Sequence, residues 1–417
     1  MPVLQSAYRS GHSTESCLLK VMSDILDAAD SGEVSLVGLL DLSAAFDTVD
    51  HDILLRRLQS SFGIGGIILH WITSFLTDRT QAVVFCGERS SVCRLNCGVP
   101  QGSVLGPLLF ILYRADVIRI GSMGVKVHCY ADDTQLYISG SEKDATTTAS
   151  RVIECINEIS SWMSSNRLKL NGDKTQFIWM GSRQRLSKIR QDALIIQGAE
   201  LSPLHSVRDL GFIIDSKLTM SDHVNNVVRS CFFQLRQLRS VRHSLPIEAR
   251  KALVHCFISS RIDYCNAILY GVSGAVLRCL QTVLNAAARL IVDAGKRQHM
   301  TPILRDLHWL PVKERILYKI GILSFQCVRR TGPAYLVEMF TRVSDVEGRS
   351  TPRSAARGDF VIPRSNTVTF GPRSFRVSGP TFWNKLPLEM RDQDISYEQF
   401  KSKLKTLLFE QAYRALL

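Results

Sequence analysis

Two adjacent carboxylates, Asp132 and Asp133, stand between two apolar runs and constrain this chain more than any other feature. The runs, residues 125–129 and 136–139, have the length and composition of short strands. The residues between them predict a tight turn, so the stretch indicates a β-hairpin with two negative charges at its tip. Aspartate is also an ordinary turn residue, and the pair by itself is compatible with a purely structural role.

A third carboxylate, Asp41, closes another apolar run, residues 34–40. A run rich in valine and leucine is typical of a buried strand, so Asp41 is expected where that strand emerges at the edge of a sheet. Three carboxylates at one edge repel each other, and a pair of divalent cations would relieve the repulsion. Polymerases use paired Mg²⁺ ions about 4 Å apart to activate a hydroxyl and stabilise the leaving oxygens.

Three motifs carry a resemblance to a known family. Residues 130–133, Tyr-Ala-Asp-Asp, resemble the catalytic motif of reverse transcriptases. Residues 41–51 are similar to the first acidic motif of that family, in the form found in LINE-type (non-LTR) retrotransposons. Residues 97–107 contain Pro-Gln-Gly-Ser and resemble the motif that lies between these two. The order and spacing match the family, which makes the set far more specific than any one motif.

The resemblance implies an α+β fold. A polymerase palm, with an antiparallel sheet packed on helices, would be followed by a helical thumb and connection and by a partly extended basic C-terminal tail. Asp41, Asp132 and Asp133 would hold two Mg²⁺ ions, with Mn²⁺ as an alternative, and would be catalytic together with Lys174. Lys174 would lie near the pyrophosphate leaving group, as a general acid or as a neutralising charge. A solvated lysine beside a turn is the structural alternative.

A second set of residues is implied to contact the incoming nucleotide: Phe46, Pro100, Gln101, Gly102 and Tyr130. By resemblance, Phe46 is the steric gate that excludes a ribose 2′-OH, although an aromatic side chain there also suits core packing. Glycines in the middle motif permit close backbone approach to a bulky partner, and a following helix N-terminus attracts phosphate. Gln101 is the residue that we single out for contact with the nascent base pair.

From Met220 onward the pattern predicts helices. Arg229, Arg236, Arg239 and Arg242 recur at offsets of seven, three and three, which spreads them along one side of a helix. A solvated face is the usual explanation. In the family this region is the thumb that follows the template-primer duplex, which favours phosphate binding. Gly211 lies in a segment that resembles the one gripping the primer end, where it would let a nucleic-acid backbone approach.

The residue composition of the chain changes beyond Thr341. Arginines and prolines among serine, glycine and threonine predict an extended or partly disordered basic segment suited to sequence-independent RNA or DNA contact. These residues are Arg349, Pro352, Arg353, Arg357, Pro363, Arg364, Pro372, Arg373 and Arg376. A capping box at 396–399 then opens a last helix. We expect a palm with partial fingers over residues 1–215, a helical thumb and connection over 216–340, the basic segment over 341–395 and a C-terminal helix over 396–417.

Composition agrees with a nucleic-acid partner. The formal net charge is +13, which favours a polyanion, although a basic surface also serves solubility. No apolar run of about 18 residues and no signal-peptide pattern are found, so we expect an intracellular protein, nuclear or cytoplasmic, that is not secreted and has no membrane partner. The eleven cysteines are expected to be free thiols, with Cys93 and Cys97 as buried structural thiols.

The sequence therefore predicts an RNA-directed DNA polymerase of a non-LTR retrotransposon. It would add deoxynucleoside triphosphates to a DNA primer 3′-OH paired to an RNA template. Upstream finger motifs and an endonuclease are not recognisable in the chain. Two alternatives follow: a truncated, inactive copy, and a nucleic-acid-binding protein without catalysis. The sequence makes no prediction of the oligomeric state.

Overall fold

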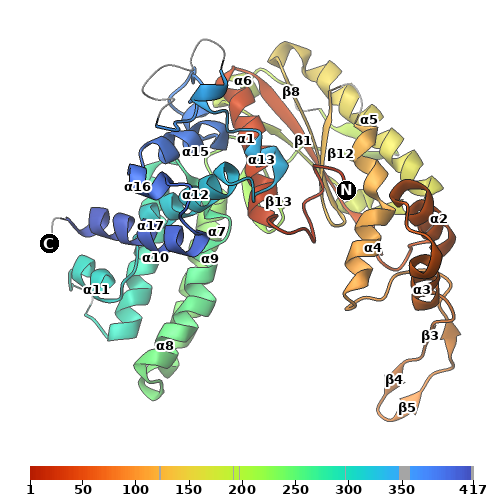
Figure 1. Cartoon of the computed structure of the whole chain (residues 1–417), viewed down its shortest axis with the longest axis horizontal. Coiled ribbons are helices and arrows are strands. Elements are labelled where there is room, and N and C mark those ends of the chain that lie inside the picture. The colour runs from red at the N-terminus through yellow and green to blue at the C-terminus, as the bar shows by residue number, and fades with distance from the viewer. Residues whose placement is uncertain (122–123, 191, 197, 296, 347–356, 415–417) are drawn as a thin grey trace. The chain divides into compact units, whose positions relative to one another are not determined.

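The computed structural model describes residues 1–121, 124–190, 192–196, 198–295, 297–346 and 357–414, which fall into two compact units (Figure 1). The first unit comprises residues 1–13, 35–179 and 187–204, and the second residues 14–34, 180–186 and 205–417. The last change of unit lies close to the boundary predicted after residue 215. Helix α1 (Thr14–Asp30) belongs to the second unit, whereas the sequence analysis placed it with the palm.

A four-stranded sheet forms the centre of the first unit. Its strands are β1 (Val34–Leu40), β7 (Lys126–Tyr130), β8 (Asp133–Gly140) and β10 (Gln176–Met180), in the order β10-β1-β8-β7. β7 and β8 pair antiparallel with Tyr130 opposite Asp133, which confirms the predicted hairpin. β1 is buried along almost its whole length, as its apolar sequence predicts. Its Gly38 makes room for Phe177, whose ring would lie 2.8 Å from a Cβ at that position.

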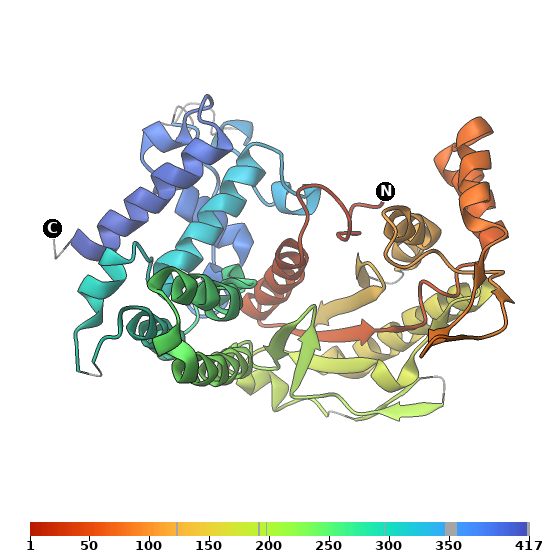
Figure 2. The same cartoon turned by 90° about the horizontal axis from the view of Figure 1, so that it is seen from below.

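The main helices of this unit are α2 (His51–Phe62), α3 (Gly66–Leu76), α4 (Leu105–Tyr113) and α5 (Ala145–Ser165). α5 contacts β8 and runs along the sheet (Figure 2). Asp50 caps α2 by accepting a hydrogen bond from the backbone nitrogen of Ile53 at 2.9 Å. α4 ends at Tyr113, and the chain continues as a 3₁₀ turn, Ala115–Ile120.

The first unit also contains short antiparallel pairs. β3 (Thr80–Gln81) pairs with β6 (Cys93–Arg94), and β4 (Val84–Phe85) with β5 (Glu88–Arg89), which together form the hairpin predicted in this region. β2 (Leu42–Ser43) pairs with β9 (Lys169–Leu170), and β11 (Leu194–Ile196) with β12 (Ala199–Leu201). All eleven cysteines are free thiols, but the expectation that Cys93 and Cys97 are buried is wrong, because this thin hairpin exposes both.

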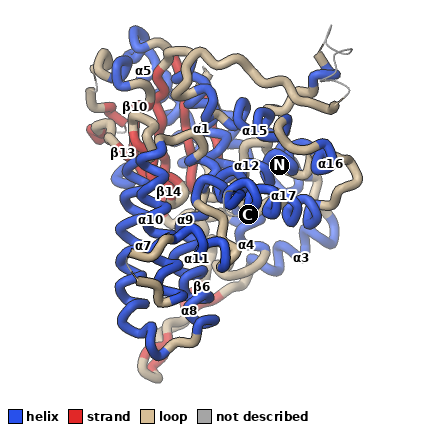
Figure 3. Tube along the Cα trace, turned by 90° about the vertical axis from the view of Figure 1, so that its left-hand side faces the viewer, coloured by secondary structure: helices blue, strands red, loops and turns tan. Residues whose placement is uncertain are grey.

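The second unit is mainly helical (Figure 3). It contains a hairpin of β13 (Ser206–Asp209) and β14 (Phe212–Asp215). Its longest helices besides α1 are α7 (Ser221–Val241), α10 (Gly274–Val292), α12 (Val312–Val328) and α17 (Tyr397–Tyr413). The shorter ones are α6 (Arg183–Leu186), α8 (Ile247–Val254), α9 (Ser260–Asp263), α11 (Met300–Asp306), α13 (Ala334–Val337), α15 (Phe375–Asn384) and α16 (Leu388–Arg391).

Helix α10 is long and apolar enough to cross a membrane by length and composition alone. Its apolar side, however, packs against α7, α8 and α12, and seven of its side chains, from Leu280 to Ile291, are buried there. An apolar helix at the centre of a bundle needs this composition to fill the core. The packing therefore accounts for the apolar sequence of α10 without a membrane.

The segment predicted to be extended is partly helical. Arg349, Pro352 and Arg353 lie outside the described residues, but residues 371–391 include α15 and α16. Trp383 of α15 is buried in a core with Phe325 of α12 and Phe400 of α17, and the last two rings stack at 4.4 Å. The expectation of an extended tail is wrong for these residues, because widely spaced aromatic side chains supply enough apolar surface to fold them. The capping box between Ser396 and Gln399 is confirmed.

Asp30 ties this segment to the end of α1. Its carboxylate accepts hydrogen bonds from the backbone nitrogens of Asn366 (2.7 Å), Thr367 (2.8 Å) and Gly371 (3.1 Å), and from the Thr367 hydroxyl (2.7 Å). Burial acts to raise the pKa of Asp30, yet these hydrogen bonds to the charged form hold it below its ordinary value. The carboxylate is therefore saturated by donors of its own unit.

Candidate active site

The hairpin tip that carries Asp132 and Asp133 is held by a buried arginine. Ala131 adopts a left-handed conformation (φ 55°) and forms the tight turn with Asp132, and Asp133 begins β8 directly after it. Arg114, almost completely buried, donates hydrogen bonds to the carbonyl oxygen of Ala131 and to the Thr134 hydroxyl. Because backbone carbonyls and hydroxyls do not neutralise it, this guanidinium also places a positive charge behind the acidic turn.

Asp41 follows β1, the strand next to β8 in the sheet. Its carbonyl oxygen accepts a hydrogen bond from the nitrogen of Asn171 at 2.9 Å, which fixes the backbone. Its Oδ2 is buried and accepts no hydrogen bond from the described residues. The Lys174 ammonium lies 3.2 Å from this oxygen, on the 3₁₀ turn Gly172–Lys174. The fold thus brings together Asp41 and Lys174, two residues singled out from the sequence.

The three carboxylates influence one another. Burial, followed by the negative charges of Asp132 and Asp41, raises the pKa of Asp133 to about 6, and Arg114 offsets only part of this effect. Solvent still reaches the Asp133 side chain. The prediction that Asp41, Asp132 and Asp133 meet at one edge of the sheet agrees with this mutual electrostatic effect. A site that concentrates negative charge in this way is suited to bind cations.

The residues implied to contact a nucleotide lie in the same unit. Phe46 is half-buried and stacks on Phe110 of α4 with ring centroids 4.5 Å apart, so it does serve packing, while its role as a steric gate stays a prediction. Gln101 donates a hydrogen bond from Nε2 to Oδ1 of Asp47 at 2.9 Å. Gly102 has φ 82° and open space beside its Cα. The Gln101–Asp47 bond joins the middle motif to the first acidic motif.

Several residues near these motifs were not singled out from the sequence. His51 Nε2 lies 2.9 Å from the carbonyl oxygen of Gly98, which holds the strand that leads into Pro100. A Cβ at Gly98 would lie 3.0 Å from the carbonyl oxygen of Asp47, so only glycine fits there with its φ of 87°. An arginine directly after an uninterrupted apolar helix was the available sequence signal for Arg114. His51 gave no such signal.

The predicted nucleic-acid contacts of the second unit differ among themselves. Arg229, Arg236 and Arg239 are exposed on α7. Arg242 lies beyond the end of α7 and pairs with Asp293 at 3.2 Å, so its charge is largely neutralised. Gly211 joins β13 to β14 with φ 84°, but a Cβ there would meet Tyr264 of the same unit at 3.4 Å. Tyr264 therefore lies beside Gly211, and both residues line a cavity of about 510 Å³ in this unit, so the approach of a nucleic-acid backbone to Gly211 stays a prediction.

Comparison with known proteins agrees with this arrangement. The model of the family "Reverse transcriptase (RNA-dependent DNA polymerase)" matches residues 1–214, just over half of the chain. The chain belongs to the reverse transcriptase family. Membership confirms the family predicted from the three motifs, and with it the mixed helix-and-sheet fold class.

Curated relatives of this chain are longer proteins. The probable RNA-directed DNA polymerase from transposon BS of Drosophila melanogaster is 28% identical over 330 residues, which cover 76% of this chain and 35% of that protein. The RNA-directed DNA polymerase from mobile element jockey of the same species is 28% identical over 233 residues, 54% of this chain and 25% of that protein. The chain thus spans about a third or less of the length of these relatives.

Among solved structures, the reverse transcriptase chain matches a telomerase from Candida albicans in complex with a TWJ fragment of telomeric RNA. The match has 16% identity and a TM-score of 0.36, and it covers 76% of this chain and 51% of the telomerase. An apo telomerase from Candida tropicalis gives 12% identity and a TM-score of 0.37 over 75% of this chain and 51% of that one.

Reverse transcriptases generally use divalent metal ions, and the carboxylates of this chain have the chemistry to hold them. Asp41 Oδ2 is buried and has the Lys174 ammonium at 3.2 Å, and burial together with the charges of Asp132 and Asp41 raises the pKa of Asp133. Carboxylate oxygens are the ligands that hard cations such as Mg²⁺ prefer. In the part of the chain that the structure describes, no group of three His, Cys, Asp or Glu side chains already converges in ligand geometry. The carboxylate oxygens of Asp41, Asp132 and Asp133 have the chemistry to bind a divalent cation, while the Lys174 ammonium lies against Asp41.

Proposed function

We propose that this chain carries the polymerase site of a non-LTR retrotransposon reverse transcriptase and copies RNA into DNA. The substrates would be an RNA template paired to a DNA primer and deoxynucleoside triphosphates. The observation that carries the proposal is the electrostatic coupling of Asp41, Asp132 and Asp133: burial and then the charges of the other two carboxylates raise the pKa of Asp133 to about 6. Neighbouring carboxylates repel each other and so destabilise the fold, and such groups are typical of functional sites.

Asp41, Asp132 and Asp133 would hold two Mg²⁺ ions. When bound, such ions lower the pKa of a primer hydroxyl and neutralise the charge that develops on a triphosphate. The carboxylates themselves position this charge at the tip of the rigid β7–β8 hairpin and at the end of β1. Arg114 keeps the hairpin tip fixed, because its guanidinium bonds to both sides of the turn.

Lys174 has a separate role in the proposal. Its side chain is 69% exposed and sits on a flexible stem, so its ammonium can turn from Asp41 to another anion. A leaving pyrophosphate next to Asp41 would be such an anion, and Lys174 would neutralise it or donate a proton to it. Phe46, immobilised by stacking on Phe110, would stand against a ribose 2′-OH.

The decisive experiment is primer extension on poly(rA)/oligo(dT) with Mg²⁺, with the Asp132→Asn variant beside the unmodified chain. We expect the variant to lose activity by at least about 10²-fold, because a charge that binds the reacting groups is removed. Asp78→Asn is the matched control: Asp78 is exposed, has φ 55°, a conformation that asparagine tolerates, and lies outside the motifs. Equal extension by all three proteins would refute the assignment.

A binding function without catalysis is the second candidate, and the exposed Arg229, Arg236 and Arg239 favour it. In that case the chain would bind duplexes in a salt-dependent way and neither protein would extend a primer. Binding that is retained by Asp132→Asn, together with absent extension by the unmodified chain, would establish this alternative.

A further inference from the structure

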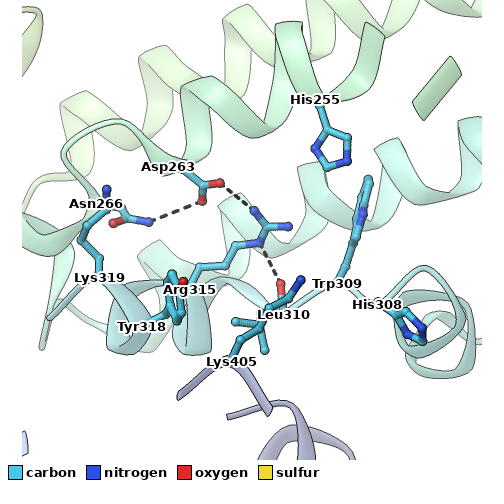
Figure 4. Close-up of a pocket in the computed structure, with 10 residues that line it drawn as sticks. All are labelled: His255, Asp263, Asn266, His308, Trp309, Leu310, Arg315, Tyr318, Lys319 and Lys405. Atoms are coloured by element: carbon cyan, nitrogen blue, oxygen red, sulfur yellow. Dashed lines mark hydrogen bonds and ion pairs between the residues drawn. The ribbon is translucent and has the colours of Figure 1, made fainter. Parts of the chain in front are cut away.

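A cavity of about 370 Å³ lies within the second unit and contains none of the residues of the candidate active site. Figure 4 shows Arg315 in its middle, with Trp309 and His255 on one side and Tyr318 and Lys319 on the other. The lining comes from α12, α17, the loop before α12 and the segment around α9. A volume of this order accommodates a small organic ligand, because binding pockets start at roughly 300 Å³.

The walls are fixed by bonds inside the unit. Arg315 Nη1 lies 2.7 Å from Oδ2 of Asp263, and its Nε donates to the carbonyl oxygen of Leu310 at 2.8 Å (Figure 4). Tyr413 of α17 donates from its hydroxyl to the carbonyl oxygen of Trp309 at 2.6 Å. The Arg315 guanidinium also lies 5.9 Å from the centre of the Trp309 ring. The cavity is therefore formed before any ligand enters.

The charge left over in the cavity is positive. Asp263 is the carboxylate among the lining residues, and Arg315 neutralises it. Lys319 pairs with Glu15 at 3.1 Å, and its side chain is partly exposed. Lys405 is exposed and makes no hydrogen bond or ion pair with any residue that the structure describes. An anionic group would find a free ammonium at Lys405 with Lys319 as a second cation.

Flat rings surround the same space. His255 and Trp309 meet edge to face at 5.6 Å, and His308 is exposed and braced by Phe409 at 5.8 Å. Tyr318 adds a half-buried ring. Nearby, Asn266 Oδ1 is buried and accepts no hydrogen bond from the described residues, so it lacks a donor. An inorganic anion would make no stacking contact with the rings, and an apolar ligand would not pair with the Lys405 ammonium.

We propose that this cavity binds one unpaired nucleotide of a single-stranded nucleic acid. Its base would lie against His308 and Tyr318, and its phosphate would face Lys405 and Lys319. A nucleobase supplies a flat face for the rings and amino groups of the kind that Asn266 Oδ1 lacks. The nucleotide must be unpaired, because a base inside a duplex offers no free face. The proposal does not rest on the proposed polymerisation, since no carboxylate of the candidate active site takes part.

Two single substitutions test the charge and the ring separately. Lys405→Ala should weaken binding of a fluorescein-labelled five-nucleotide oligo(A) about 3- to 10-fold and lower the salt slope by about one. Lys403→Ala is the matched control, because Lys403 is exposed on the same helix and does not line the cavity; it should change binding less than twofold. His308→Ala should weaken binding about 5-fold, as expected for the loss of one ring contact. Both changes are at exposed positions, and thermal unfolding checks that the fold is intact.

The outcomes separate the proposal from its rivals. Equal losses of binding in Lys405→Ala and Lys403→Ala would show general attraction to a basic surface and would overturn the proposal. The proposal would also be overturned if an unlabelled duplex displaced the labelled five-mer as effectively as an unlabelled single strand. AMP should compete for the cavity, whereas inorganic phosphate at the same concentration should not. Measuring oligo(rA) and oligo(dA) in parallel tells whether the cavity binds RNA or DNA, because the substitutions weaken binding of the kind of strand that enters the cavity. Primer extension by the same variants stays unchanged, so failure here and failure of the polymerase assignment are distinguishable.

Discussion

Asp30 and Asp133 show two opposite ways of placing a carboxylate in a folded chain. Asp30 accepts four hydrogen bonds of 2.7 to 3.1 Å from residues 366–371, which hold its pKa below the ordinary value despite burial. The pKa of Asp133 rises to about 6 through burial and the charges of Asp132 and Asp41. A carboxylate that serves the fold is saturated by its own unit. A carboxylate crowded by like charges keeps its capacity to bind something else.

The two sites contribute to stability with opposite pH dependence. The stabilisation from Asp30 is present above its unfolded pKa and is lost as the pH falls through the lowered folded pKa. For Asp133 the folded state holds the proton more tightly than the unfolded state does. The free energy of unfolding therefore falls as the pH rises from 3.8, the ordinary pKa of aspartate, to about 6, and it stays lower above that range.

The largest effect is expected at Asp30. Asp30→Ala leaves three backbone N-H groups, among which that of Gly371 belongs to a buried residue, and the Thr367 hydroxyl without their acceptor, which should cost about 3 kcal/mol and lower the melting temperature by several degrees. Thermal unfolding followed by circular dichroism measures the loss. Asp306→Ala is the control, because Asp306 is exposed and contacts only the neighbouring Arg305 in the structure described here; it should cost under about 0.5 kcal/mol. Equal losses in both variants would contradict the special role of Asp30.

The contrast also shows what the sequence can predict. The hairpin around Asp132 and the strand before Asp41 follow from local patterns, since alternation, apolar runs and turn residues are all neighbours in the chain. Three of the four donors of Asp30 are backbone groups, which every residue possesses, and they lie 336 to 341 residues away. No sequence pattern marks such a partner.

Other misses have the same physical origin. Few apolar residues in 341–395 predicted an extended segment, but Trp383 and Phe375 are enough to fold part of it, because they meet apolar side chains of distant helices. Tyr264 packs beside Gly211 and donates a hydrogen bond to the carbonyl oxygen of Leu210, fifty-four residues away, which is another contact that no local pattern marks. Long-range packing decides these positions, and the local pattern does not contain it.

A divalent cation should stabilise the crowded site and leave the saturated one unaffected. With Mg²⁺ in excess we expect the melting temperature of the unmodified chain to rise by roughly 2–4 °C at constant ionic strength, because the cation binds the folded state alone. Asp41→Asn should lose most of this rise. Lys174→Met should enlarge it, because the ammonium 3.2 Å from Asp41 Oδ2 no longer competes with the cation. A rise that is the same in all three proteins would place the cation elsewhere.

The smallest effect, and the one opposite in sign to Asp30→Ala, is expected for Asp133→Asn. The substitution removes one of three repelling charges, so in metal-free buffer at pH 8 the chain should melt roughly 1–2 °C higher, a gain under about 1 kcal/mol because solvent screens this exposed side chain. At pH 4 the unmodified Asp133 is already protonated in the folded state, since its pKa is about 6, and the gain should vanish. Asp78→Asn should change the melting temperature at neither pH. Equal gains at both pH values, or a loss at pH 8, would mean that Asp133 supports the fold as Asp30 does, and the distinction between the two carboxylates would fail.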